Sequence, residues 1–247
     1  SGETVEVVNA ISSQFTDARA LFLGMFAAIL SVEMYSRIVN SGKLDIKMPD
    51  SVPSNVSGSF RTVFPAIITI MLMAGIGQLF EAIFGHTLFD AITLFIQTPL
   101  QGVLTGLPGY LFLFFISTVL WTFGIHGTQV LGPIYVSTLL IALTENTEAV
   151  SVGLEPTNIL NRAFVNIFTI PTGAGITFGL IVAILLFSTR EDHRAIAKLS
   201  IVPGIFNINE TMTFGLPIVL NPIFMIPFVI APVVSATIGY WLTKIGF

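Results

Sequence analysis

The sequence contains no cysteine and few charged residues for its 247-residue length. The absence of cysteine excludes disulfide bonds, thiolate-bound metals and a cysteine nucleophile. Lysine, arginine, aspartate and glutamate together make up 10% of the residues, whereas a soluble domain carries charge on about a quarter of its residues. No basic patch with interleaved aromatic residues is present, so nucleic acid is not an expected partner. The first twenty residues are polar and lack a positively charged segment, so they do not predict a signal peptide.

Long apolar runs take the place of charge. Apolar residues make up 53% of the chain, and the mean hydropathy is +0.89. A helix needs roughly 20 mostly apolar residues to cross a bilayer. Five runs contain no Asp, Glu, Lys or Arg: residues 21–32, 62–80, 91–144, 163–189 and 211–243. Most of them reach or approach that length. The sequence therefore predicts an all-α polytopic membrane protein in a lipid bilayer.

The expected helices follow these runs and the breaks between them. Residues 85–106 mix apolar and polar side chains and predict an amphipathic helix in the membrane interface. Gly132-Pro133 interrupts the run at 107–144, which is either two crossings or one crossing with a partial hairpin. Glu33 and Arg37 are four residues apart and are expected to pair. Spanning helices are expected at 17–40, 62–84, 107–124, 163–189 and 218–243, and loops at 41–59, 145–162 and 190–198.

Basic residues in short loops predict the orientation, because such loops stay in the cytoplasm. Lysine and arginine gather around the predicted loops 41–59 and 190–198, whereas the predicted loop 145–162 is mostly acidic. We therefore expect the first two loops to face the cytoplasm and the third to face outside. Within the span at 163–189, Gly173 and Gly175 predict either a kink or a close helix contact.

Two ionisable residues lie inside apolar stretches. His126 lies in a window of more than fifty uncharged residues, and Glu210 is the only formal charge between Lys198 and Lys244. A charge at mid-bilayer costs about 2.5–3.5 kcal/mol on insertion scales and by default indicates a functional site. The alternatives are a histidine bonded to a neighbouring helix and a neutral, structural glutamate.

Residues that disfavour continuous helix surround both candidates. Gly124 and Gly127 flank the histidine, and Pro203 with Gly204 precedes the glutamate. Transporters use broken helices of this kind at the membrane midplane to bind substrate. The amides of Asn207 and Asn209 suit sugar hydroxyls, and Trp121 offers a flat apolar face on which a sugar ring could stack.

Two motifs carry a resemblance to a known family. Residues 124–127, Gly-Ile-His-Gly, and residues 204–210, Gly-Ile-Phe-Asn-Ile-Asn-Glu, resemble the membrane-spanning C component of the lactose/cellobiose/chitobiose branch of the bacterial phosphotransferase system. Residues 46–53 and 214–222 match the same family. One departure is Thr211, where the family usually has proline after the glutamate.

The resemblance implies a homodimeric permease in the bacterial plasma membrane that carries a β-linked disaccharide inward. A partner B subunit phosphorylates the sugar, using a phosphoryl group that comes from phosphoenolpyruvate and is held on a cysteine of that partner. The chain alone is thus expected to lack a complete active site, and no cofactor or metal is expected. A proton-coupled sugar carrier and a membrane scaffold without transport are the alternative functions.

The resemblance also implies roles for particular residues and segments. It implies that Glu210 and His126 are the catalytic residues and that Trp121 binds the substrate. From their own chemistry and position, Asn207, Asn209, Gly124 and Gly127 are also expected to bind the substrate. The chain is expected to be part of a longer protein. Residues 1–84 would end a scaffold and dimerisation part, residues 85–106 would form an interfacial linker, and residues 107–247 would bind the substrate.

Overall fold

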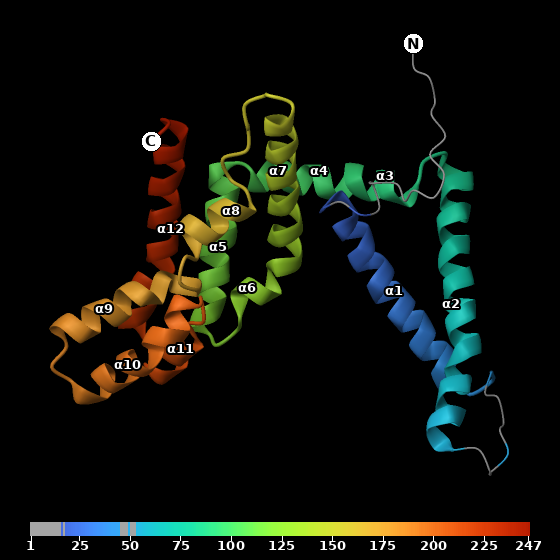
Figure 1. The fold of residues 1–247 in the computed structure, drawn as a ribbon, viewed down its shortest axis with the longest axis horizontal. Coiled ribbons are helices and arrows are strands. Elements are labelled where there is room, and N and C mark those ends of the chain that lie inside the picture. Colours follow the sequence, from blue (N-terminus) through green and yellow to red (C-terminus); the bar gives the residue numbers. More distant parts are fainter. Residues whose placement is uncertain (1–15, 17, 45–48, 50–52) are drawn as a thin grey trace. The chain divides into compact units, whose positions relative to one another are not determined.

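The computed structural model describes residues 16, 18–44, 49 and 53–247 (Figure 1). The predicted polar segment 1–15 and most of the family-like stretch 46–53 lie outside the described residues. The chain forms two compact units, Ser1–Thr98 and Pro99–Phe247. In the described part there is no β-strand, only an isolated bridge between Pro171 and Gly173, so the all-α prediction is confirmed.

The first unit is built on a hairpin of two long helices, α1 (Leu21–Asn40) and α2 (Ser54–Phe84), with the short turn η2 (Ala18–Ala20) ahead of α1. The predicted Glu33–Arg37 pair is present, with 2.6 Å between Arg37 Nε and Glu33 Oε1. The prediction that residues 41–59 are all loop is wrong at its end, because α2 already begins at Ser54. Pro53 directly precedes the helix, where its missing N–H costs nothing.

A bent helical segment follows α2. It consists of α3 (Leu88–Ile92), the π-helical turn η3 (Thr93–Gln97) and α4 (Thr98–Leu104). Thr87 caps α3, since its Oγ1 accepts a hydrogen bond from the Asp90 N–H at 3.1 Å. The segment Leu88–Leu104 meets the next helix at 91°. The amphipathic helix predicted at 85–106 is therefore helical for most of its length, and its place in the membrane interface stays a prediction.

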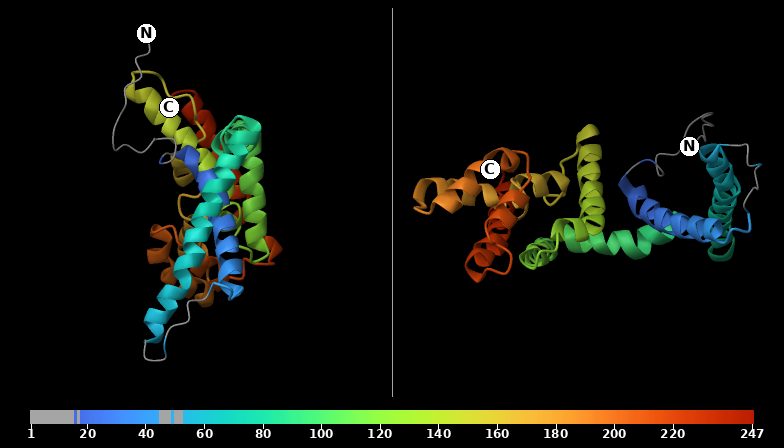
Figure 2. Two further views of the ribbon diagram at one scale, coloured as in Figure 1. Left: turned by 90° about the vertical axis from the view of Figure 1, so that its right-hand side faces the viewer. Right: turned by 90° about the horizontal axis from the view of Figure 1, so that it is seen from below.

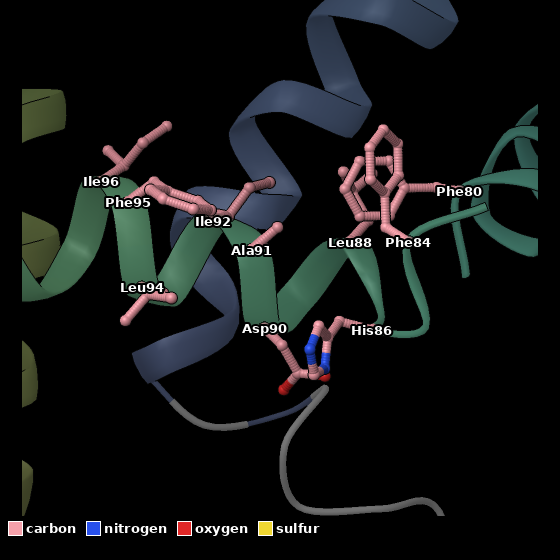
Figure 3. A pocket seen from close by; sticks show the side chains of 10 residues that line it. All are labelled: Phe80, Phe84, His86, Leu88, Asp90, Ala91, Ile92, Leu94, Phe95 and Ile96. Atoms are coloured by element: carbon pink, nitrogen blue, oxygen red, sulfur yellow. The ribbon is translucent and has the colours of Figure 1, made fainter. Parts of the chain in front are cut away.

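An apolar pocket of about 820 Å³ lies beside the start of this segment (Figure 3). In Figure 3 the rings of Phe80 and Phe84 gather at one end of the pocket, and His86 and Asp90 lie together below them. The remaining lining residues are Leu88, Ala91, Ile92, Leu94, Phe95 and Ile96. Its apolar walls suit hydrocarbon better than a polar solute.

Four helical segments in the described part are long and apolar enough to span a membrane. They are Ala18–Asn40, Ser57–Phe84, Arg162–Phe187 and Pro222–Lys244. Leu88–Leu104 and the next helix, α5 (Leu107–Thr122), give a fifth only if this bent pair counts as one span. In an 18-residue apolar stretch of each of the four segments, only 6% and 11% of the first two are buried, against 33% and 28% of the last two. The helices of the first unit therefore leave their apolar surface to lipid or to other protein surfaces.

The second unit is organised around α5 (Leu107–Thr122), α7 (Gly132–Ser151) and α12 (Pro222–Lys244), with the short α6 (Gly127–Val130) between α5 and α7 (Figure 1). Helices α5 and α12 lie side by side. Buried aromatic side chains join α5 to α7, because the Phe114 ring lies between those of Tyr110 and Tyr135 at 4.8 and 5.1 Å. This packing fixes the start of α7 relative to the first half of α5.

Helix α7 extends further than the sequence predicted. The expected acidic loop at 145–162 is wrong for its first part, because the helix continues to Ser151. Glu145 is tolerated there because it accepts hydrogen bonds from Gln101 Nε2 at 2.8 Å and from Asn158 Nδ2 at 2.9 Å. A partly buried carboxylate with such partners no longer favours a solvent-exposed loop.

The predicted span at 163–189 is a broken helix. It consists of α8 (Arg162–Phe164), the π-helical turn η4 (Val165–Thr169), the short turn η5 (Ala174–Ile176) and α9 (Thr177–Phe187). Gly173 and Gly175 have φ of 85° and 77°, and both are in close contact with other segments. A Cβ at Gly175 would lie 2.2 Å from Phe228 Cδ2 of α12. The two glycines thus serve both alternatives, the kink and the close contact.

The predicted charged loop at 190–198 is wrong, since these residues form much of α10 (Glu191–Ile205). Glu191 and Asp192 lie in its first turn, where negative charge stabilises a helix. Arg194 donates to the Leu185 and Ser188 carbonyl oxygens at 2.8 and 3.2 Å and so closes the end of α9. Helices α9 and α10 form a hairpin that projects from the other helices of this unit (Figure 2). After α10 the chain turns at residues 206–209 into the short α11 (Glu210–Gly215).

Candidate functional site

The site is built where the turn between α10 and α11 meets the break before α9. Asn207, at a φ of 67°, accepts a hydrogen bond from the Gly173 N–H at 2.6 Å. Asn209 Nδ2 donates to the Ala174 carbonyl oxygen at 2.7 Å and to Thr213 Oγ1 at 3.3 Å. Two interrupted helices thus satisfy each other's polar groups, which a membrane interior requires of non-helical backbone.

His126 is held at the start of α6. Its Nδ1 accepts a hydrogen bond from the Gln129 N–H at 3.2 Å and lies 3.1 Å from Thr128 Oγ1. Because the Gln129 N–H can only donate, the neutral imidazole carries its proton on Nε2. The ring therefore presents an N–H group on the side that faces Glu210.

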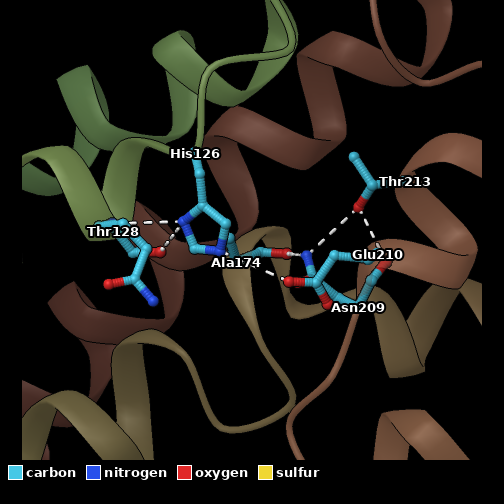
Figure 4. Close-up of polar contacts among 7 residues, drawn as sticks. His126, Thr128, Ala174, Asn209, Glu210 and Thr213 are labelled. Carbon is cyan, nitrogen blue, oxygen red and sulfur yellow. Dashed lines mark hydrogen bonds and ion pairs between the residues drawn. The ribbon is translucent and has the colours of Figure 1, made fainter. Parts of the chain in front are cut away.

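Glu210, the first residue of α11, faces this N–H group. Its Oε1 lies 3.4 Å from His126 Nε2, and both side chains are partly exposed, at 44% and 38% (Figure 4). This distance is slightly longer than a usual N–H···O hydrogen bond, so the carboxylate oxygens remain available to accept a hydrogen bond from a ligand. The two residues that the sequence placed 84 positions apart thus share one site.

The pair lies on the wall of a pocket of about 620 Å³ in the second unit. The lining mixes polar and apolar groups, unlike the pocket beside α3. Its lining residues are His126, Thr128, Gln129, Gly132, Tyr135, Val136, Arg162, Ile170, Gly173, Ala174, Asn207, Ile208, Asn209 and Glu210. A concave site with several convergent polar groups is typical of a pocket for a small polar molecule.

Three predicted substrate-binding residues are not among those that line the pocket. The Trp121 side chain is 1% exposed, and the His126 ring lies 4.1 Å from it at a tilt of 48°. Gly124 forms the turn after α5 with φ of 80°, and Gly127 lies so close to α5 that a Cβ would be 1.9 Å from the Ser117 carbonyl oxygen. In this conformation the indole face points to the histidine, and the glycines shape the turn that carries it. Stacking of a sugar on Trp121 stays a prediction.

The two predicted asparagines do line the pocket, but part of their hydrogen-bonding capacity is used elsewhere. Asn207 is exposed, and its side-chain Oδ1 accepts the hydrogen bond from the Gly173 N–H. Asn209 is 4% exposed, and its amide nitrogen holds the break at Ala174. Both residues therefore have a structural function beside any contact with a ligand.

Sequence reasoning missed four polar residues of the pocket: Thr128, Gln129, Tyr135 and Arg162. The first two follow His126 directly, and their proximity in sequence was the available signal. The sequence predicts Arg162 at the end of the loop 145–162. The structure instead places it at the start of α8, on the wall of the pocket.

Taken together, the broken helices, the polar pocket between them and the apolar spans are typical of one class, the polytopic membrane transporters. In the described residues no group of three or more His, Cys, Asp or Glu side chains could hold a metal ion.

Comparison with known proteins identifies the family. The family model "Phosphotransferase system, EIIC" matches residues 3–232. The oligo-beta-mannoside-specific EIIC component of Bacillus subtilis is 38% identical over 234 residues, which are 93% of this chain and 52% of that protein. The cellobiose-specific EIIC component of Lactococcus lactis is 32% identical over 256 residues, covering 95% of this chain and 51% of the relative.

The fold agrees with a solved structure of the same family. The crystal structure of ChbC, the IIC component of the N,N'-diacetylchitobiose-specific phosphotransferase system, matches with a TM-score of 0.85 at 33% identity. The match covers 99% of this chain and 56% of ChbC. The chain belongs to the EIIC family of the phosphotransferase system, as the motifs around His126 and Glu210 predicted, and is a multi-pass component of the bacterial plasma membrane. It spans about half the length of the curated relatives that it matches.

Proposed function

We propose that the protein containing this chain is the membrane permease of a phosphoenolpyruvate-dependent sugar phosphotransferase system. It binds a β-linked disaccharide in the pocket of His126 and Glu210 and presents it to a phosphorylated B subunit. The names of the similar proteins support this substrate class, since they include oligo-beta-mannoside, cellobiose, lactose and diacetylchitobiose.

The observation that supports the proposal best is the pair at 3.4 Å on the pocket wall. His126 offers a hydrogen-bond donor and Glu210 a negatively charged acceptor. Neighbouring hydroxyls of a sugar can accept from the first and donate to the second. Hydrogen bonds to an ionised group are roughly twice as strong as neutral ones, so the carboxylate is the stronger anchor.

The same pair can assist phosphoryl transfer. The oxygen of the bound sugar hydroxyl attacks the phosphorus, its proton passes to the Glu210 carboxylate, and the bond from phosphorus to the donor breaks. With the cysteine donor that the resemblance implies, the leaving group is the partner's thiolate. Glu210 acts as the general base, and the N–H of His126 holds the hydroxyl oxygen in place. Trp121, packed against the imidazole, keeps that ring oriented.

The proposal includes a homodimer, for which the first unit supplies support. Its helices α1 and α2 bury little of their apolar surface within the chain. Such surface fits a second copy or lipid. The names of the lactose-specific relatives, EIICB components, support cooperation with a B component.

The test is sugar uptake into membrane vesicles that contain the full-length protein. Labelled cellobiose, lactose and diacetylchitobiose are offered with and without phosphoenolpyruvate and the soluble components of the system. We expect accumulation of one sugar as its phosphate only when the complete system is present. Glu210→Gln should abolish this accumulation, because an amide cannot take the proton, while Glu155→Gln, in the exposed loop before α8, should not affect it.

Three results would contradict the proposal. Uptake that is driven by a proton gradient without phosphoenolpyruvate would identify a proton-coupled carrier instead. Normal phosphorylation by Glu210→Gln would remove the carboxylate from the reaction. Failure to bind any of the sugars would favour a scaffold.

A further inference from the structure

Arg162 places a cation on the pocket wall, apart from the catalytic pair. It is the first residue of α8, directly after Asn161, whose Oδ1 accepts hydrogen bonds from the Ala163 and Phe164 N–H groups at 3.0 and 3.1 Å. The guanidinium carbon lies 5.8 Å from the centre of the Tyr135 ring of α7. The cap and the ring therefore hold the arginine at a fixed point of the pocket.

The guanidinium has unused hydrogen-bonding capacity. Within the part of the chain that the structure describes, no carboxylate oxygen lies within 4.0 Å of it. Its Nη1 is buried and has no hydrogen-bond partner among the described residues. A buried donor without an acceptor is costly, and in native structures it calls for an explanation. A cation at the start of an apolar span adds to that cost and points to a function.

Arg162 and Glu210 line the same pocket but do not form an ion pair. In Figure 1 α8 lies above α6 and α11, the two helices that hold His126 and Glu210. Arg162 also borders the loop 152–161, which precedes the broken span, whereas the turn at Ser188 follows it. Our orientation prediction places the segment 145–162 outside and the segment 190–198, which follows the broken span, in the cytoplasm, from which a B subunit must approach. Arg162 then lies at the end of the pocket away from the phosphoryl donor.

We propose that Arg162 is a specificity-determining residue that binds the second ring of the disaccharide, the ring that is not phosphorylated. This inference rests on the proposed function. The guanidinium donates to oxygen atoms of that ring, while the ring that reacts lies between His126 and Glu210. A planar group with five donors matches neighbouring sugar oxygens, and these oxygens supply an acceptor for Nη1, which has none among the described residues.

The test compares two ligands on the purified full-length protein. One is the disaccharide that binds best, and the other is the methyl β-glycoside of its phosphorylated ring, which lacks the second ring. Equilibrium binding is measured for the wild type, Arg162→Ala, Arg162→Lys and Glu210→Gln. Arg190→Gln is the control for loss of a positive charge, because Arg190 lies outside the pocket and pairs with Asp192.

Arg162→Ala should weaken disaccharide binding about ten- to hundredfold, as expected for hydrogen bonds from a charged donor. Its affinity for the single-ring glycoside should change less than about twofold, since that ligand does not reach Arg162. Glu210→Gln should weaken the binding of both ligands, and Arg190→Gln should change the binding of neither. Arg162→Lys keeps the charge and should lose part of its affinity for the disaccharide but none for the glycoside. This variant serves as the test if Arg162→Ala does not fold.

Several outcomes overturn the inference. Equal losses for both ligands would give Arg162 a structural role, and unchanged affinities would remove it from the site. Unchanged affinities with slower phosphorylation would place it near the phosphoryl group instead. If the wild type binds the disaccharide but not the glycoside, an alanine variant that still binds the disaccharide normally is the refuting result. A wild type that binds neither ligand refutes the proposed function itself.

Discussion

Substitution of Gly173 by alanine tests whether the contact between the two interrupted helices builds the site. Gly173 has φ of 85° and ψ of 176°, a region that is open essentially only to glycine. Its N–H donates to Asn207 at 2.6 Å, and a Cβ would lie 2.8 Å from the Asn209 Cβ. The added methyl group thus meets the start of a side chain rather than a flexible end, so the turn before Glu210 must move.

The magnitude follows from two contributions. Holding a residue other than glycine in this conformation costs about 1–3 kcal/mol. Forcing a methyl group into a packed contact costs about 1–3 kcal/mol more. The free energy of unfolding should therefore fall by about 2–6 kcal/mol, and the thermal unfolding midpoint by at least about 4 °C. Sugar binding should weaken as well, because Asn209 and Glu210 are displaced.

The assay is thermal unfolding of the purified protein, with Gly179→Ala as the matched control. Gly179 lies in α9, and a Cβ there would meet no atom within 4 Å. Its replacement should leave the midpoint unchanged or raise it, since alanine favours helix over glycine by about 1 kcal/mol. Asn209→Gly removes the atoms that the new methyl group meets. The double variant Gly173→Ala, Asn209→Gly should thus be more stable than the sum of the single changes predicts, by about 1–3 kcal/mol.

The reasoning is refuted if Gly173→Ala unfolds at the same temperature as Gly179→Ala. If the stability losses of Gly173→Ala and Asn209→Gly simply add in the double variant, the new methyl group does not meet the Asn209 side chain. Backbone strain would then account for the whole loss in Gly173→Ala.

Two further predictions concern Trp121 and the orientation of the chain. Trp121→Ala should weaken sugar binding several-fold, to about tenfold, and Trp121→Phe less, because an aromatic pair contributes about 0.5–1.5 kcal/mol and the indole ring lies 4.1 Å from the His126 ring. Unchanged affinity of the alanine variant in an equilibrium binding assay would remove Trp121 from the site. In a cysteine-free background, single cysteines at Ser41, Leu154 and Arg190 should react differently with a membrane-impermeant thiol reagent in intact cells. Only the Leu154 position should be labelled, and labelling at Ser41 from outside would reverse the predicted orientation.

Much of the architecture could be predicted from the sequence, because a bilayer imposes simple demands. Long uncharged runs can only be helices in lipid, and the structure has helices at all five predicted spans. The cost of an ionisable group in such a run singled out His126 and Glu210 without any knowledge of the fold. The family-like motifs around them then indicated the sugar phosphotransferase system.

Charge was a weaker guide at the ends of elements. Glu145 and the residues 190–198 were assigned to loops because charged side chains favour water. The structure instead places them in α7 and α10, where Gln101, Asn158 and the end of α9 supply partners. Gln101 lies 44 residues before Glu145, and even the nearer partners are chosen by how the chain folds back, which no local pattern contains.

Tertiary structure alone decided how the site is assembled. The sequence determined which residues are unusual, namely His126, Glu210 and the glycines and asparagines of the interrupted helices. It did not determine that Asn207 and Asn209 join the turn before α11 to the break at Gly173, or that Trp121 lies behind the histidine. Nor did it show that Arg162 lines the pocket. Hydropathy depends on each residue's own side chain, whereas a pocket depends on which distant backbones approach closely enough to bond.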